Sequence, residues 1–74
     1  MSVEKIVGKN VRGYRQRVGW TQEKLAARCK LHSQYISRLE LGHEQPTLKT
    51  LVRIAKELKI EMYLLLKEDS YKDE

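Results

Sequence analysis

Apolar residues recur along this chain at spacings of three and four, which is typical of helices that bury one face. Two stretches show the pattern over several turns, residues 1–18 and residues 47–59. In the first stretch the apolar positions are Val3, Val7, Val11, Tyr14 and Val18. In the second they are Leu48, Leu51, Val52, Ala55 and Leu58, and Ile54 widens the stripe. We therefore expect two helices whose apolar sides supply much of a single core.

Residues 21–42 predict two shorter helices joined by a turn. Thr21 can cap the first of them, because its hydroxyl can accept a hydrogen bond from a free backbone N–H group. Leu25, Ala26 and Cys29 follow at helical spacing and form a narrow apolar face. Ala26 suits a place where two helices cross closely, since a larger side chain would push them apart.

The second short helix has its cap at His32 or Ser33 and ends at Gly42, a residue suited to a left-handed stop. Ile36 and Leu39 point inward in this arrangement. Two short helices with a tight turn between them form a helix-turn-helix pattern.

The outer face of this second helix carries polar side chains that can read base edges. Gln34 can pair with adenine N6 and N7, and Arg38 with guanine O6 and N7. Ser33 and Ser37 can donate to or accept from several bases. We therefore predict that these four residues contact bases in the major groove of duplex DNA.

Residues 60–67, IEMYLLLK, are apolar on nearly all sides. We expect a fifth short helix with a surplus apolar face, which usually marks an interface; burial within the monomer is the alternative. The predicted fold is a compact, all-α, five-helix domain over residues 1–67. Residues 68–74, EDSYKDE, are highly charged and are expected to form a disordered tail.

Taken together, these motifs resemble the lambda-repressor/Cro-like (XRE) helix-turn-helix family from about Val7 to Leu66. The positions that match are Arg15, Gly19, Thr21, Gln22, Leu25, Ala26, Ile36, Leu39, Glu40, Gly42 and Pro46. Lys30 departs from the pattern, because the family usually has glycine in that turn. The resemblance implies a transcriptional regulator whose second motif helix lies in the major groove. Among small members of the family, the segment LHSQYISRLELG looks most like controller proteins of restriction-modification systems.

The resemblance also implies roles for individual residues. Arg15 would form an ion pair with Glu40, and Gln22, at the start of a helix, would contact a DNA phosphate. Further candidates for phosphate contacts are Asn10, Arg12, Lys30, His32, Tyr35 and His43. Similar proteins pair through their last helix into two-fold dimers, here through Ile60, Met62, Tyr63, Leu65 and Leu66.

Charge supports a polyanionic partner, although the total of +5 informs less than its distribution. Residues 1–30 carry eight basic and two acidic side chains, a net charge of +6. The remaining residues carry seven basic and eight acidic side chains, a net charge of −1. A solvated basic surface is the alternative, but it does not explain the polar helix face.

Other classes of function have little support in the sequence. It shows no nucleophile with a base, no catalytic pair of carboxylates and no phosphate-binding glycine loop, so we do not expect an enzyme. Cys29 and His32, with His43 and Glu44, have a spacing that zinc could use, but Cys29 falls on the apolar face. We expect no metal, cofactor, small-molecule ligand or membrane segment, and a cytoplasmic protein.

The sequence thus predicts a homodimer that binds a palindromic operator and regulates transcription. The alternative is a protein-interaction module, for example one like an antitoxin, that keeps the fold but reads little DNA sequence.

Overall fold

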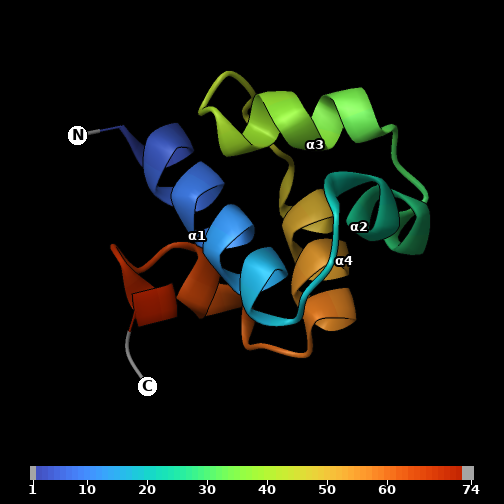
Figure 1. Cartoon of the computed structure of the whole chain (residues 1–74). Coiled ribbons are helices and arrows are strands. Elements are labelled where there is room, and N and C mark those ends of the chain that lie inside the picture. Colours follow the sequence, from blue (N-terminus) through green and yellow to red (C-terminus); the bar gives the residue numbers. More distant parts are fainter. Residues whose placement is uncertain (1, 73–74) are drawn as a thin grey trace.

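The computed structural model describes residues 2–72 and is all-α, as predicted. Four α-helices are followed by two short 3-10 helices, η1 and η2 (Figure 1). Their bounds are α1 Val3–Arg17, α2 Gln22–Cys29, α3 Ser33–Glu40, α4 Leu48–Leu58, η1 Met62–Leu65 and η2 Ser70–Lys72. In Figure 1, α3 lies along one edge of the molecule, and α1, α2 and α4 lie together on its inner side.

The helix-turn-helix forms as the sequence predicts. Thr21 caps α2, its hydroxyl accepting a hydrogen bond from the backbone N–H of Lys24 at 3.0 Å. Lys30 adopts the left-handed conformation with φ of 57°, so the turn keeps the backbone geometry that usually favours glycine. This conformation costs a non-glycine residue about 1 kcal/mol. His32 occupies the cap position of α3 without a side-chain hydrogen bond.

One core joins all four α-helices. Val11, Leu25, Ile36 and Ile54, one from each helix, are 0% exposed. Ala26 of α2, a helix that packs against both α3 and α4, is 2% exposed, which agrees with the prediction of a small side chain between close helices. The core therefore fixes α3 by its inner face and leaves the opposite face to solvent.

The prediction of a fifth α-helix is wrong, because a short 3-10 helix forms there. Lys59 takes a left-handed conformation with φ of 59° and ends α4, and the apolar stretch after it forms only the four-residue η1. This turn packs against α1 and α4. The apolar character of this stretch indicated burial correctly for Leu65 but not for Tyr63 and Leu66, which are exposed. So short a segment is stabilised by packing and not by helix propagation.

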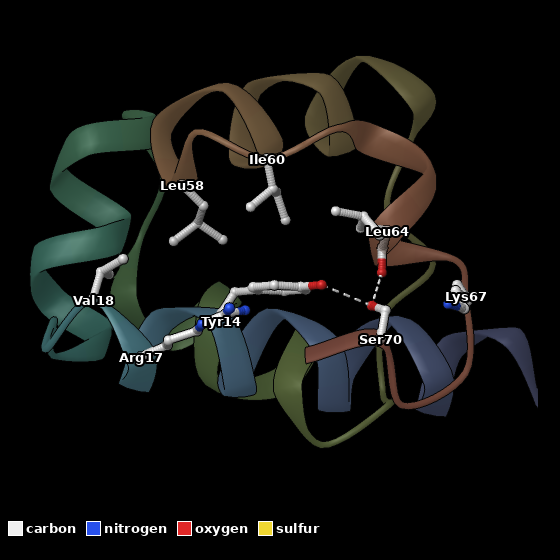
Figure 2. A pocket seen from close by; sticks show the side chains of 8 residues that line it. All are labelled: Tyr14, Arg17, Val18, Leu58, Ile60, Leu64, Lys67 and Ser70. Carbon is white, nitrogen blue, oxygen red and sulfur yellow. Dashed lines mark hydrogen bonds between the residues drawn. The ribbon is translucent and has the colours of Figure 1, made fainter. Parts of the chain in front are cut away.

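The expected disordered tail is also corrected for residues 68–72. Ser70 is buried, and the Tyr14 hydroxyl donates to Ser70 Oγ at 3.1 Å. Ser70 Oγ in turn donates to the Leu64 carbonyl, on one side of an open hollow (Figure 2). Gly13 of α1 leaves the space that the Tyr71 ring occupies. Residues 73–74 of the expected tail lie outside the described part of the chain.

Candidate nucleic-acid interface

The outer face of α3 presents the four residues predicted to contact bases. Gln34 and Arg38 are exposed, and Ser33 and Ser37 are half-buried. On the inner side of the helix, Ile36 and Leu39 are 0% exposed, and Glu40 is buried. The helix is therefore held by apolar contacts on one side while donors and acceptors remain accessible on the other.

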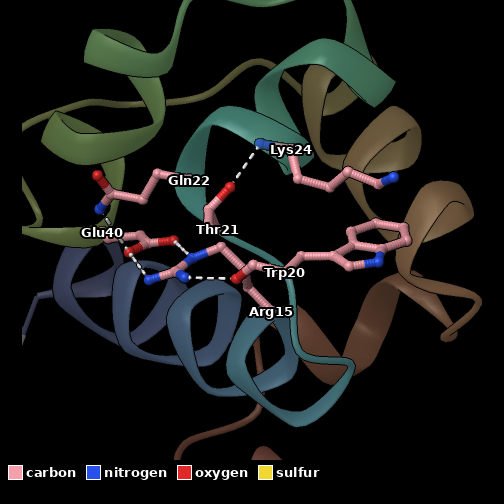
Figure 3. A network of polar contacts seen from close by, with 6 residues as sticks. All are labelled: Arg15, Trp20, Thr21, Gln22, Lys24 and Glu40. Atoms are coloured by element: carbon pink, nitrogen blue, oxygen red, sulfur yellow. Dashed lines mark hydrogen bonds and ion pairs between the residues drawn. The ribbon is translucent and has the colours of Figure 1, made fainter.

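An ion pair holds α3 to α1, as predicted from Arg15 and Glu40. Arg15 Nε lies 2.7 Å from Glu40 Oε2, and Arg15 Nη2 lies 3.0 Å from Oε1 (Figure 3). Arg15 Nη1 also donates to the Trp20 carbonyl at 2.8 Å, which ties the turn before α2 to the same group. The hydrogen bonds to Glu40 raise the pKa of Arg15 above its ordinary value. The two hydrogen bonds form a bidentate pair that is largely shielded from water, and they fix the position of α3 relative to α1.

Gln22 joins this network through its amide group. Its Nε2 donates to Glu40 Oε1 at 2.9 Å, so one end of the amide is held by the ion pair (Figure 3). The backbone N–H groups of the first turn of α2 remain suited to a phosphate oxygen. A shallow hollow brings Arg12, Gln22 and Ser37 together, one from each of α1, α2 and α3.

Asn10 was expected to contact phosphate, and the structure contradicts this. Its side chain is 0% exposed, and Nδ2 donates to the carbonyls of Leu65 at 2.9 Å and Lys67 at 2.8 Å. Asn10 therefore fastens the C-terminal segment to α1. Its place between Val7 and Val11 on the apolar stripe was the sequence signal for this role.

The other phosphate candidates differ in exposure. The exposed ones are Arg12, Lys30, His32 and His43. Tyr35 is half-buried and packs against the core. Burial and the charge of Glu44 raise the pKa of Tyr35, and a hydrogen bond with Thr50 acts in the opposite direction. The Tyr35 hydroxyl is thus partly engaged within the protein.

The sequence analysis did not predict the pairing of Glu44 with Arg38. Arg38 Nε donates to Glu44 Oε2 at 2.8 Å, and Arg38 Nη2 donates to the His43 carbonyl at 3.4 Å. An acidic residue shortly after Gly42, the glycine that follows the predicted recognition helix, was the available signal. One of the predicted base contacts is therefore already held by a carboxylate of the loop that follows α3.

The predicted dimer residues divide into two groups. Leu65 is 0% exposed and belongs to the core, so its assignment to an interface is wrong. Ile60 and Met62 are half-buried and pack against the core. Tyr63 and Leu66 are 62% and 44% exposed. We use the name C-terminal apolar surface for Tyr63 and Leu66 of the η1 region together with the exposed Leu48 and Val52 of α4.

Among residues 2–72, no helix is long and apolar enough to cross a membrane. The same residues hold no group of three or more His, Cys, Asp and Glu side chains that could bind a metal ion. Cys29 is 0% exposed, and burial raises the pKa of its thiol to about 11. The thiol is therefore protonated at neutral pH.

Comparison with known proteins shows the family to which the chain belongs. A family described as helix-turn-helix matches residues 11–65. An uncharacterized HTH-type transcriptional regulator, y4dJ of Sinorhizobium fredii, is 41% identical over 58 residues, which cover 78% of this chain and 75% of that protein. Control protein C.SmaI of Serratia marcescens is 36% identical over 74 residues, which cover 100% of this chain and 88% of that protein.

A solved structure agrees in fold as well as in sequence. The restriction-modification controller protein C.AhdI of Aeromonas hydrophila superposes with a TM-score of 0.81 at 29% identity. The match covers 84% of this chain and 94% of that protein. The likeness therefore includes nearly the whole of that chain.

Proposed function

Because this chain belongs to the XRE-type helix-turn-helix family of DNA-binding transcription regulators, we propose that it reads a palindromic operator as a homodimer. Each subunit places α3 in a major groove, and the two recognition helices lie about 34 Å apart, one helical turn of DNA. The members of this family are regulators and not enzymes. We propose that the protein acts in the cytoplasm, because the DNA of bacteria, the source of its relatives, lies there.

The observation that carries this proposal is the division of α3 into two faces. Its inner face is fixed by Ile36, Leu39 and the Glu40 ion pair, and its outer face offers Gln34 and Arg38 to solvent. A rigidly held helix with bidentate hydrogen-bonding side chains on its free side suits direct reading of bases. Ser33 and Ser37 complete this reading face.

Phosphate contacts would orient the reading face on the duplex. We assign them to the first turn of α2 at Gln22 and to the exposed side chains of Arg12, Lys30, His32 and His43, with Tyr35 in a lesser role. The net charge of +6 on residues 1–30 favours the approach of this half of the chain to DNA. Such contacts set affinity and register but carry no sequence information.

The C-terminal apolar surface is the proposed dimer interface. Leu48 and Val52 lie one helical turn apart on α4, and η1 packs against this helix. These four large apolar side chains are 44–64% exposed, and a second copy that covers them would remove their apolar area from water. A domain of this size also gains stability from pairing.

The regulated system is proposed from likeness to the controllers. C.SmaI aligns over the full length of this chain, and C.AhdI shares its fold. We therefore propose a controller-type regulator of a restriction-modification system. A protein-interaction module with the same fold remains the second candidate, because apolar side chains exposed on α4 and η1 also suit a different protein partner.

Selection of bound sites from a random oligonucleotide pool tests sequence-specific reading. We expect an enriched palindrome and a steep loss of affinity with salt, because phosphate contacts release counterions. Recovery of no enriched sequence, with weak and uniform binding, would favour the interaction module.

Sedimentation tests the dimer separately. We expect the parent protein to form dimers and Leu66→Lys to shift it toward monomers with weaker operator binding. Val18→Lys is the matched control, because Val18 is 46% exposed and lies outside the C-terminal apolar surface. A parent protein that stays monomeric at high concentration would refute pairing.

A further inference from the structure

The loop after α3 places a carboxylate beside the proposed DNA-reading face. Glu44 lies four residues beyond Glu40, the last residue of α3, and pairs with Arg38. A negative charge near DNA phosphates weakens association. Its presence at this position is therefore costly unless the carboxylate contributes to recognition.

The backbone of α3 itself fixes where this carboxylate lies. Gly42 takes φ of +82°, its N–H donates to the Leu39 carbonyl at 3.0 Å, and the His43 N–H donates to the Arg38 carbonyl at 2.9 Å. These two bonds form a Schellman motif, which sets the exit direction of the chain. A Cβ at Gly42 would lie 2.8 Å from Lys5 Cγ, so the turn also packs closely on α1.

The residues after Glu44 are fastened as well. Gln45 Nε2 donates to Glu4 Oε2 at 2.6 Å, which joins the loop to α1. Thr47 caps α4, its hydroxyl accepting from the Thr50 N–H at 3.1 Å. Glu44 thus sits between the fixed end of α3 and the fixed start of α4, and its position relative to Arg38 is built into the fold.

The pairing occupies one edge of the Arg38 guanidinium and leaves another available. Nε binds Glu44, and Nη2 makes a long contact with the His43 carbonyl. Within residues 2–72, Nη1 has no hydrogen-bond partner. The edge formed by Nη1 and Nη2 can donate two parallel bonds, which is the geometry that guanine O6 and N7 accept.

We propose that Glu44 is a positioning residue for base recognition: it holds Arg38 by Nε so that the Nη1–Nη2 edge is presented to guanine. The inference rests on the proposed reading of DNA by α3. Without Glu44, Arg38 samples more rotamers and reaches phosphates on either strand. Glu44 therefore raises specificity for one guanine while lowering affinity for other sequences.

Glu44→Gln tests this, since it removes the charge and keeps the size. Equilibrium anisotropy measures binding to the selected operator, to operators with single base-pair substitutions, and to unrelated duplex DNA. At the base pair that Arg38 reads, we expect discrimination to fall at least threefold and affinity for unrelated DNA to rise. Discrimination at positions read by Gln34 should not change.

Glu57→Gln is the matched control. Arg28 Nε lies 3.0 Å from Glu57 Oε1, and the two side chains are 48% and 25% exposed, close to the 52% and 29% of Arg38 and Glu44. This control makes the same change of charge away from the reading face, so it should leave discrimination at every base pair unchanged.

A double-mutant cycle with Arg38→Ala separates the possible outcomes. If Arg38→Ala leaves discrimination intact, reading by Arg38 is wrong and the role of Glu44 falls with it. If Arg38→Ala abolishes discrimination at one guanine but Glu44→Gln does not reduce it, only the positioning role is overturned. An equal gain in affinity for all sequences in Glu44→Gln would show that Glu44 merely competes with DNA, and an equal loss would show a structural role. Both results overturn the proposal.

Discussion

Two Arg–Glu pairs flank α3, and they have nearly the same shortest N–O distance but very different exposure. On the inner side, Arg15 Nε lies 2.7 Å from Glu40, and the side chains are 10% and 3% exposed. On the outer side, Arg38 Nε lies 2.8 Å from Glu44, and the side chains are 52% and 29% exposed. The inner pair joins two helices, whereas the outer pair joins a helix to the loop that follows it.

Burial, and not the N–O distance, therefore determines how much such a pair contributes to the stability of the fold. Removing one partner of a buried pair leaves a charge without water or a counterion. An exposed pair is solvated with or without its partner and adds little to stability. The same two residue types can therefore fasten the scaffold on one side of α3 and remain available to DNA on the other.

Arg15→Ala should have the largest effect. It leaves the buried Glu40 carboxylate without its guanidinium, and we expect the free energy of unfolding to fall by about 3 kcal/mol. For a domain of this length that corresponds to a decrease in Tm of about 12–24 °C. Thermal unfolding followed by circular dichroism measures it, with the exposed neighbour Arg12→Ala as control. A Tm equal to that of the parent would rule out a structural pair.

Asn10→Ala tests a second buried polar contact, the one between α1 and the C-terminal segment. It leaves the Leu65 and Lys67 carbonyls without a buried donor, and we expect a loss of about 2 kcal/mol in the free energy of unfolding. DNA affinity, measured on protein that is still folded, should equal that of the parent, since Asn10 is 0% exposed. Intact stability with weakened DNA binding would restore Asn10 as a phosphate contact.

Arg38→Ala should have the opposite effects, with stability nearly unchanged and DNA recognition weakened. We expect stability to change by no more than about 0.5 kcal/mol, because the pair with Glu44 is exposed. Discrimination against the wrong base should fall by about 1–3 kcal/mol at one position of each half-site. Parallel measurements of unfolding and of binding to substituted operators test both parts, and a large loss of stability would contradict the contrast between the two pairs.

Burial of the Cys29 thiol in the core makes the stability of the protein depend on pH. Burial raises the pKa of its thiol from 9.0 to about 11, so the folded state holds this proton more tightly than the unfolded state does. The resulting contribution is complete below pH 9 and is lost as pH rises toward 11. Relative to Cys29→Ala, the parent should lose about 1 kcal/mol between pH 8 and pH 10. Parallel pH profiles for the two proteins would show instead that the thiol is solvated.

The regular parts of the fold were accessible from the sequence because local signals agreed with one another. Thr21 caps α2 and Gly42 ends the turn after α3, as predicted. Of the predicted apolar stripe on α4, Leu51, Ile54, Ala55 and Leu58 lie in the core, whereas Leu48 and Val52 are exposed. The buried pair of Arg15 and Glu40 came from resemblance to a family. Its two members lie 25 positions apart, and no local pattern links them.

The parts that were missed depend on tertiary packing. The stretch after Lys59 has an apolar pattern but too little length for a stable helix, so the core decided its conformation. Ser70 looked like part of a charged tail, yet it is buried beside Tyr14. Glu44 was missed because its role depends on the exit direction set by Gly42, which residue composition does not report.

Replacement of each operator guanine in turn by 7-deazaguanine is a direct test of guanine recognition by Arg38 on α3, because this base keeps its pairing with cytosine and loses only the N7 acceptor in the major groove. We expect the parent protein to lose affinity at one guanine of each half-site and Arg38→Ala, already weakened there, to lose no more. Equal sensitivity of the two proteins, or no sensitivity at any guanine, would contradict recognition of guanine by Arg38 on the outer face of α3.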